Sequence, residues 1–157
     1  PRDNRKVSSG KPGKFRLNHI GLVVESIEEF KNLFRTIGLT DITDTVSNPI
    51  QRVYGAFVSV LDDNSVHIEL LEPGNETSPI TNFLKKRGGG LHHLCFEVDD
   101  IERTSAELVQ KGFQMISPPA DCAAYDVNFQ RECENVTRIA FFLVSKRFLI
   151  ELIEKGR

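Results

Sequence analysis

The chain has 157 residues, of which 39% are hydrophobic and 27% are charged, and its formal net charge is −2. A chain of this size buries about two-thirds of its unfolded surface, so it can form a substantial core. The small net charge does not indicate nucleic acid or an acidic membrane as a partner. The longest apolar run, residues 139–144, is far shorter than the roughly 20 residues of a membrane-spanning helix, so we expect no membrane insertion.

The chain contains three cysteines, at Cys95, Cys122 and Cys133. An odd number without a metal-type CxxC spacing argues against a disulfide framework and favours a reducing compartment. We therefore expect a cytoplasmic protein and interpret the cysteines as packing residues. Residues 1–14 are rich in Lys, Arg, Ser, Gly and Pro and show no apolar period, so they predict a flexible basic tail.

The next stretch alternates strand and helix signals. Ser26 has the position of a helix cap with Glu29 three residues later, and Gly38 has the position of a helix end. The glycine run 88–90 is interpreted as a hinge between two halves. The elements predicted before it are a strand at 15–24, a helix at 26–38, strands at 41–47, 52–61 and 65–71, and a helix at 79–87.

The second half repeats this order. Gly112 ends its helix as Gly38 ends the first, and the stretch 118–138 is long and of mixed character. The elements predicted in this half are a strand at 91–98, a helix at 100–112, a short strand at 113–116, and strands at 138–144 and 148–154.

Landmarks of the first half recur in the second at one constant spacing. The segment IELLE at 68–72 also recurs, as IELIE at 150–154, but at a longer spacing. Because the two spacings differ by eight positions, the second half must contain eight extra residues between 112 and 138. The landmark pairs that share the shorter spacing are His19 and His93, Ile27 and Ile101, and Gly38 and Gly112.

The repeat predicts an α+β fold built from two βαβββ modules, residues 15–87 and 91–157, within a single domain of residues 15–157. Each module is too small to close its own core, whereas two modules side by side can bury each other's sheets. We expect a curved mixed sheet around a metal cup, with the helices on its outer face.

Each module supplies one histidine on its first strand and one glutamate on its last: His19 and Glu69, then His93 and Glu151. A carboxylate that faces inward on an apolar strand is costly unless it is paired or binds a metal. Two imidazoles and two carboxylates form a mixed nitrogen and oxygen site that suits Co, Ni, Zn, Mn or Fe. Because thiolates are absent from this set, a closed structural zinc site is not expected.

Two further histidines are close in sequence. His67 shares a strand face with Glu69 but has no partner in the repeat, so it is the main further candidate for a ligand. Strand alternation directs His92 to the face opposite His93, which indicates a structural role.

The motifs LNHIGLVVESIE (17–28) and GLHHLCFEVDDIE (90–102) resemble the vicinal oxygen chelate superfamily of glyoxalases, bleomycin resistance proteins and dioxygenases. Within it, residues 69–101 resemble the methylmalonyl-CoA epimerase family, and the resemblance extends over residues 17–154. The segment 122–134 differs from the family pattern.

This resemblance implies that His19, Glu69, His93 and Glu151 hold a divalent metal that binds the substrate carbonyl or its enolate. Glu151, with Glu69 as its mate, would move a proton alpha to a thioester carbonyl. It also implies a small-molecule substrate such as a CoA thioester, and a homodimer.

Three alternatives use the same cup. A glyoxalase I-type lyase would use the same four residues. A ring-cleaving Fe(II) dioxygenase uses two histidines and one carboxylate, so the second glutamate counts against it. A non-catalytic binding or resistance protein need not keep four metal ligands.

Overall fold

The computed structural model describes residues 15–146 and 148–157, and the predicted tail at 1–14 lies outside this described part. The elements, in chain order, are β1 (Arg16–Val23), α1 (Ile27–Thr36), β2 (Val46–Asn48), β3 (Val53–Ser59), β4 (His67–Pro73), α2 (Thr81–Arg87), β5 (Gly90–Glu97), α3 (Ile101–Gln110), β6 (Gln114–Asp121), α4 (Ala123–Asn128), β7 (Arg138–Ser145) and β8 (Phe148–Glu154).

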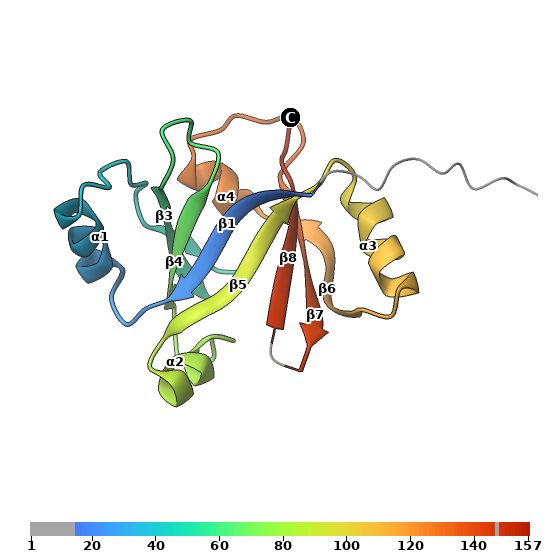
Figure 1. Ribbon diagram of the computed structural model, residues 1–157, viewed down its shortest axis with the longest axis horizontal. Coiled ribbons are helices and arrows are strands. Elements are labelled where there is room, and N and C mark those ends of the chain that lie inside the picture. Colours follow the sequence, from blue (N-terminus) through green and yellow to red (C-terminus); the bar gives the residue numbers. More distant parts are fainter. Residues whose placement is uncertain (1–14, 147) are drawn as a thin grey trace, which may run out of the picture.

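All eight strands form one mixed sheet in the order β2-β3-β4-β1-β5-β8-β7-β6. The two modules meet where β1 pairs antiparallel with β5 at the centre of the sheet. On either side of that pair, β4 lies parallel to β1 and β8 lies parallel to β5. The curved sheet and the two βαβββ modules are the fold predicted from the sequence, and Figure 1 shows α1 and α3 at opposite ends of the molecule.

The predicted caps and spacings explain where the helices begin. The Ser26 side chain accepts a hydrogen bond from the Glu29 backbone N–H at the start of α1, and Asp100 accepts one from Arg103 at the start of α3. The first strands of the two modules and the helices that follow them are related by the same spacing as the two landmark histidines. The sequence repeat is therefore also a structural repeat.

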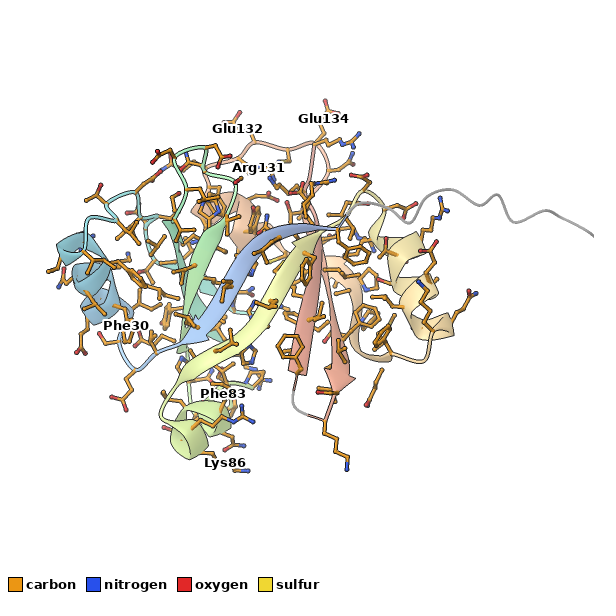
Figure 2. All side chains as sticks on the ribbon, in the orientation of Figure 1. Phe30, Phe83, Lys86, Arg131, Glu132 and Glu134 are labelled. Carbon is orange, nitrogen blue, oxygen red and sulfur yellow. The ribbon has the colours of Figure 1, made fainter. Side chains whose placement is uncertain are left out.

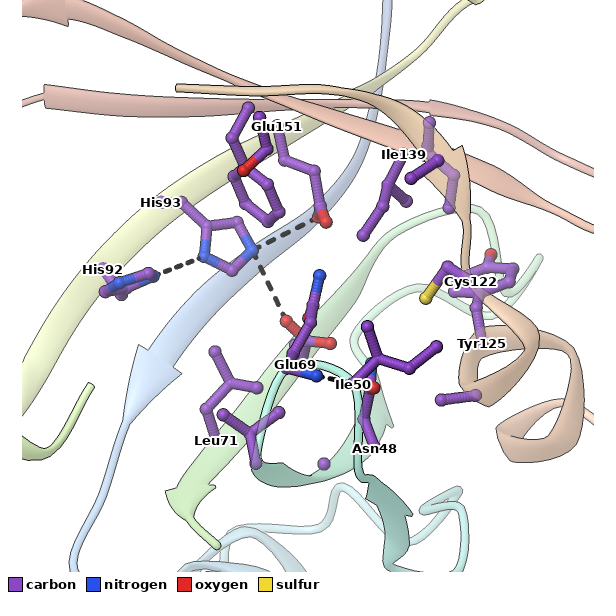
Figure 3. Close-up of a pocket in the computed structure, with 18 of the residues that line it drawn as sticks. Asn48, Ile50, Glu69, Leu71, His92, His93, Cys122, Tyr125, Ile139 and Glu151 are labelled. Carbon is purple, nitrogen blue, oxygen red and sulfur yellow. Dashed lines mark hydrogen bonds and ion pairs between the residues drawn. The ribbon is translucent and has the colours of Figure 1, made fainter. Parts of the chain in front are cut away.

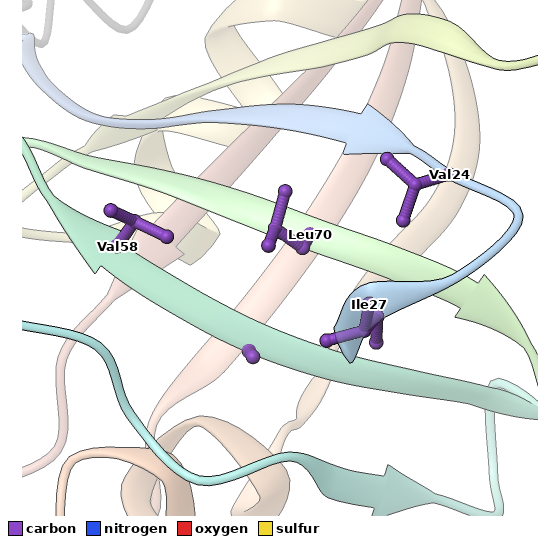
Figure 4. Close-up of a cluster of buried hydrophobic side chains, with 5 residues drawn as sticks. Val24, Ile27, Val58 and Leu70 are labelled. Carbon is purple, nitrogen blue, oxygen red and sulfur yellow. The ribbon is translucent and has the colours of Figure 1, made fainter. Parts of the chain in front are cut away.

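The two outer helices pack on matching apolar clusters. Beneath α1 lie Val24, Ile27, Ala56, Val58 and Leu70, four of which are labelled in Figure 4. A fully buried residue of this type stabilises the fold by about 1.5–3 kcal/mol. The corresponding cluster beneath α3 consists of Val98, Ile101, Ala140, Phe142 and Leu152.

The stretch 118–138 differs from the sequence expectation. The predicted short strand 113–116 is the beginning of β6, which continues through Pro118 and Pro119 to Asp121. Prolines are tolerated there because β6 is an edge strand and needs no N–H donors on its free side. After β6 the chain forms α4, a helix of six residues that the sequence pattern did not predict.

Helix α4 lies on the inner face of the sheet rather than on its outer face, and it contacts β2 and β3 of the other module. Asn128 on α4 donates hydrogen bonds to the backbone oxygens of Asp44 and Gly55, at 3.3 and 3.1 Å. The helix thus connects the two edges of the sheet across its concave face, beside the pocket drawn in Figure 3.

The segment after α4, which carries Arg131, lies at one end of the molecule near the end of β8 (Figure 2). The Arg131 guanidinium contacts the Asp126 carboxylate at 2.9 Å and donates to the Gly156 carbonyl at 2.7 Å. Asp126 also accepts from the Thr137 hydroxyl at 2.6 Å. These contacts fix α4 to the C-terminal end of the sheet.

None of the helices in the described part of the chain has the length and apolar character needed to cross a membrane. Cys95, Cys122 and Cys133 are free thiols. Cys95 and Cys122 pack in an apolar cluster with Phe57 and Ile153, in agreement with a packing role.

Candidate metal centre

The two predicted histidines meet at the centre of the sheet. His19 lies on β1 and His93 on β5, and their Nε2 atoms are 3.1 Å apart although the two residues are distant in sequence. Gly21, opposite His93 in the register, makes this possible, because a Cβ atom there would clash with the His93 ring. Both imidazoles are almost completely buried.

Each imidazole is held through its other nitrogen. The Nδ1 atom of His19 lies 2.7 Å from Asn18 Oδ1, which can only accept, so this nitrogen carries a proton. The Nδ1 atom of His93 lies 2.8 Å from Nδ1 of His92. Burial and the neighbouring His93 lower the pKa of His92 to about 4, so His92 is neutral at pH 7 and its Nδ1 atom can accept a hydrogen bond from His93 Nδ1. Both Nε2 lone pairs can therefore face each other across the centre.

Two β-bulges place these supporting residues. The pairing of β1 with β5 shifts register at Asn18 and again at His92, which directly precede His19 and His93 and therefore hold equivalent positions of the repeat. At a bulge the regular alternation of side chains is interrupted, so consecutive residues can approach the same site. His92 was expected on the face opposite His93, whereas it lines the same cavity and its Nδ1 atom lies 2.8 Å from that of His93.

The two glutamates reach the imidazole pair from flanking strands. Glu69 on β4 is paired with Gly21 of β1, and Glu151 on β8 is paired with Cys95 of β5. Glu151 Oε1 lies 2.9 Å from His19 Nε2 and 3.4 Å from His93 Nε2. Glu69 Oε1 lies 3.5 and 3.4 Å from the same two atoms. The structure thus brings all four predicted site residues together, as Figure 3 shows for three of them.

The electrostatics of the four groups are strongly coupled. Burial alone would raise the pKa of Glu151 and of Glu69, but the hydrogen bonds and charges of the two imidazoles outweigh it and lower both pKa values. Burial lowers the pKa of His19 and of His93. The surrounding acidic groups raise it by more, so both pKa values lie above their usual value. Without a metal, protons on the imidazoles therefore balance the two carboxylates.

The donor set fits a divalent cation. Glu151 Oε1 is buried and, although it lies 2.9 Å from His19 Nε2, it has no hydrogen bond of regular geometry. His19, His93 and Glu151 each offer a ligand atom, and these atoms lie within 4.8 Å of one another. Among the described residues, no lysine or arginine lines the cavity to neutralise the carboxylates. Such a mixed site is typical of Zn, Ni, Co, Fe or Mn.

His67, the further candidate ligand, lies outside this group. Its ring packs against Phe57 and Phe129, with centroid distances of 6.1 and 4.8 Å, and its Nδ1 atom has no hydrogen-bond partner. Burial and the neighbouring His19 lower the pKa of His67, so the neutral form is favoured. Its environment is aromatic packing rather than metal coordination.

The centre opens into a cavity of about 440 Å³ that both modules and α4 line. Phe57 packs edge-on against His19 at 5.3 Å, and Phe141 packs in the same way against His93 at 5.8 Å. These rings give the imidazoles apolar walls and keep water from their sides. The cavity is therefore apolar around a polar centre, the usual character of a small-molecule site.

Helix α4 also reaches the centre through hydrogen bonds. Asn18 Nδ2 donates to the Tyr125 hydroxyl at 3.3 Å, while Asn18 Oδ1 holds His19. Burial raises the pKa of Tyr125 to about 12, so its hydroxyl keeps its proton at neutral pH. Asn18, His92 and Tyr125 were not predicted as site residues. The sequence could have indicated Asn18 and His92, because a polar residue directly precedes the histidine at the same position of each repeat.

Comparison with known proteins agrees with this architecture. Residues 18–129 match the family model of the glyoxalase/bleomycin resistance protein/dioxygenase superfamily. The chain is 34% identical over 117 residues to methylmalonyl-CoA epimerase, mitochondrial, of Dictyostelium discoideum, covering 74% of this chain and 69% of that protein. It is 33% identical to the mouse protein of the same name, covering 70% of this chain but only 61% of the mouse protein.

Solved structures show the same fold. A hypothetical protein from Bacillus halodurans C-125 is 32% identical, with a TM-score of 0.75 and coverage of 92% of this chain and 96% of its own. Methylmalonyl-CoA epimerase from Mycobacterium tuberculosis is 24% identical, with a TM-score of 0.72 and coverage of 90% and 89%. The fold is therefore shared with epimerases and with a protein of unassigned function.

Proposed function

This chain belongs to the glyoxalase/bleomycin resistance protein/dioxygenase superfamily, and we propose that it is a metal-dependent epimerase acting on an acyl-CoA thioester. In this proposal the enzyme removes the proton alpha to the thioester carbonyl and returns it on the opposite face. The curated relatives named methylmalonyl-CoA epimerase support methylmalonyl-CoA as the first substrate to test.

The observation that carries the proposal is the placement of the two carboxylates. The strand order sets β4 and β8 on opposite sides of the β1–β5 pair. Glu69 and Glu151 therefore approach the imidazole pair from two sides. Epimerisation requires one group that takes a proton from one face of a carbon and another that delivers it to the opposite face.

His19, His93, Glu151 and Glu69 would hold a divalent metal. When bound, such an ion polarises the thioester carbonyl and stabilises negative charge on its oxygen by several kcal/mol. Asn18 and His92 keep the two imidazoles in the tautomer and orientation that ligation requires. The rings of Phe57 and Phe141 exclude water from the same space.

The glutamates supply the acid–base chemistry. Because their pKa values lie below the usual range, both side chains are ionised at neutral pH. Glu151 Oε is our assignment for the atom that takes the alpha proton. Glu69 first takes a proton from solvent, and its carboxyl group is the assignment for the acid that returns a proton from the other side, while Glu151 releases the proton it has taken to solvent. Since the returned proton comes from a second group that equilibrates with solvent between turnovers, reaction in D₂O should label the alpha carbon.

The test is deuterium exchange at C2 of methylmalonyl-CoA in D₂O. The protein is stripped with a chelator and reloaded separately with Co²⁺, Ni²⁺, Zn²⁺, Mn²⁺ or Fe²⁺, and elemental analysis gives the bound metal. We expect exchange with at least one ion and none in the stripped protein. Absence of exchange with every ion, at full metal occupancy, would refute the epimerase assignment.

Matched assays separate the alternatives. Consumption of the hemithioacetal of methylglyoxal and glutathione, without exchange at C2, would identify a glyoxalase-type lyase. Oxygen uptake with a catechol in the Fe²⁺-loaded protein would identify a dioxygenase. Binding of small molecules without turnover in any of these assays would identify a binding or resistance protein.

A further inference from the structure

The imidazoles of the two modules are supported by different kinds of side chain. In the second module, His93 is contacted by the imidazole of His92, whereas in the first the acceptor for His19 is the amide of Asn18. Asn18 is buried, with 4% of its surface exposed. A primary amide has a donor end as well as an acceptor end, and both need partners when the group is buried. The support of His19 therefore depends on the group that pairs with the amide nitrogen of Asn18.

The partner of that nitrogen comes from the other module. Asn18 Nδ2 donates to the Tyr125 hydroxyl at 3.3 Å, and Tyr125 lies on α4, the helix that the first module lacks. Within residues 15–146 and 148–157, this hydroxyl is the one acceptor for Asn18 Nδ2. Because Tyr125 is only 7% exposed, water does not readily take its place. A short chain of hydrogen bonds thus connects α4 to the imidazole of His19.

Ligation of a metal would fix the direction of this chain. A metal at Nε2 leaves the proton of His19 on Nδ1, so the amide of Asn18 must turn its oxygen toward the imidazole. Its NH₂ group then faces the hydroxyl oxygen of Tyr125, which has lone pairs to accept. A phenyl ring at the same position would leave the buried NH₂ group without an acceptor, which costs free energy in the state that binds metal.

Contacts with both modules hold α4 in place. Asn128 donates to the Gly55 backbone oxygen of β3 at 3.1 Å. On the other side, the buried Asp126 accepts from the hydroxyl and from the backbone N–H of Thr137, directly before β7, at 2.6 and 3.0 Å. Tyr125 lies in the same helix as these two anchors, so both modules set the position of its hydroxyl.

Ring packing alone does not account for a hydroxyl at this position. The Tyr125 ring packs against Phe57 and Phe129, with centroid distances of 5.6 and 4.8 Å. A phenylalanine would make the same ring contacts. The hydroxyl is the part of the side chain that packing leaves unexplained, and its contact is with Asn18.

We propose that Tyr125 is a positioning residue of the metal centre: through Asn18 it holds His19 in the orientation and tautomer that ligation requires. The inference rests on the metal cup of the proposed function, though not on the epimerase reaction. Tyr125 and Asn128 also line the cavity. The helix that forms part of the substrate wall in the second module thereby sets the orientation of a metal ligand in the first.

The test is a double-mutant cycle on Zn²⁺ affinity, measured by competition with a chromogenic chelator. Tyr125→Phe keeps the ring and removes only the hydroxyl, so we expect the affinity to fall by about two- to tenfold, the range of one neutral hydrogen bond. In the Asn18→Ala background the same substitution should have no further effect. An equal loss in both backgrounds would refute a role through Asn18. Tyr54→Phe, at the only other tyrosine of the chain and 41% exposed, is the matched control and should leave the affinity unchanged.

A spectroscopic measurement separates positioning from a general loss of stability. In the Zn²⁺-loaded protein, the hydrogen bond to Asn18 should slow the exchange of the His19 Nδ1 proton with water, which NMR of the imidazole N–H groups detects. Asn18→Ala identifies this signal. We expect faster exchange of the same proton in Tyr125→Phe, whereas the Nδ1 proton of His93 should keep its rate. An equal change for both imidazoles, or a change for neither, would refute the positioning role.

The outcomes for this inference and for the proposed function remain separable. Unchanged Zn²⁺ affinity and N–H exchange in Tyr125→Phe, with normal deuterium exchange at C2, would refute the positioning role alone. The expected changes in Tyr125→Phe without any deuterium exchange at C2 would support the positioning role and refute the epimerase reaction. A wild-type protein that binds no divalent ion would refute both.

Discussion

The two modules of this protein bring the same donor residues to the centre but surround them with different residues. In both, a histidine from the first strand and a glutamate from the last meet at the centre, and a phenylalanine ring packs against the imidazole. The outer clusters beneath α1 and α3 also match position by position. The features that build the fold and gather the four donors are therefore the ones that both modules share.

The differences between the modules lie in the residues that surround the four donors. Asn18 supports the imidazole of the first module, whereas His92 supports that of the second. His67 in β4 corresponds to Leu149 in β8, because the first is paired with His19 and the second with His93. The second module alone inserts α4. The comparison teaches that duplication supplies two matching pairs of donor residues, and that residues without a counterpart give the two pairs different surroundings.

The largest expected effect tests whether the two glutamates are equivalent. Glu151→Gln and Glu69→Gln should each lower deuterium exchange by about 10²- to 10⁴-fold, as expected for a lost acid–base group. Glu151→Gln should also lose more metal, because its carboxylate is 2.9 Å from His19 Nε2 and only 7% exposed, whereas Glu69 is 17% exposed. Exchange rates and elemental analysis of both variants measure the difference.

Equal metal loss in the two variants would show that the carboxylates are interchangeable ligands. Full activity in Glu151→Gln would remove it from the acid–base assignment while leaving the metal cup intact.

A smaller effect concerns the residues that support the imidazoles. Asn18→Ala and His92→Ala should each weaken metal binding by about 10- to 100-fold, because the Nδ1 proton of the ligand loses its acceptor. His92→Asn places the acceptor type of the first module in the second and should restore most of the affinity. Competition with a chromogenic Zn²⁺ chelator measures all three variants.

If His92→Asn binds metal as weakly as His92→Ala, the contact at 2.8 Å does not orient His93 through an accepted hydrogen bond. The supporting residues of the two modules would then have different roles.

The smallest effect concerns His67, whose counterpart is a leucine. Its pKa is lowered in the folded protein by burial and by His19, so the unfolded chain binds this proton more readily. The stability that His67 contributes is thus full above its ordinary pKa of 6.5 and is lost as pH falls below it. His67→Leu should flatten the fall in stability between pH 7.5 and 5.5, as urea unfolding at fixed metal content would show.

The absolute stability of His67→Leu is not the readout, since a leucine also changes the packing against Phe57 and Phe129. Parallel pH profiles for the two proteins would contradict a neutral, buried His67.

The sequence alone predicted the superfamily, the two βαβββ modules and the curved mixed sheet, and the family comparison and the structure confirm these. The reason is that a duplicated pattern carries its information locally: alternation marks strands, and Ser26 and Asp100 mark helix starts. The four proposed ligands also followed from the repeat, because equivalent positions of equivalent modules must face the same centre. Their role in metal binding stays a prediction.

Only the tertiary structure placed the residues around that centre. Asn18 and His92 act through bulges, which interrupt the alternation on which strand predictions depend. Tyr125 reaches Asn18 from a distant part of the chain, on a short helix with no side-chain cap to mark its start. Such features arise from contacts between distant segments, which the local pattern of a sequence does not encode.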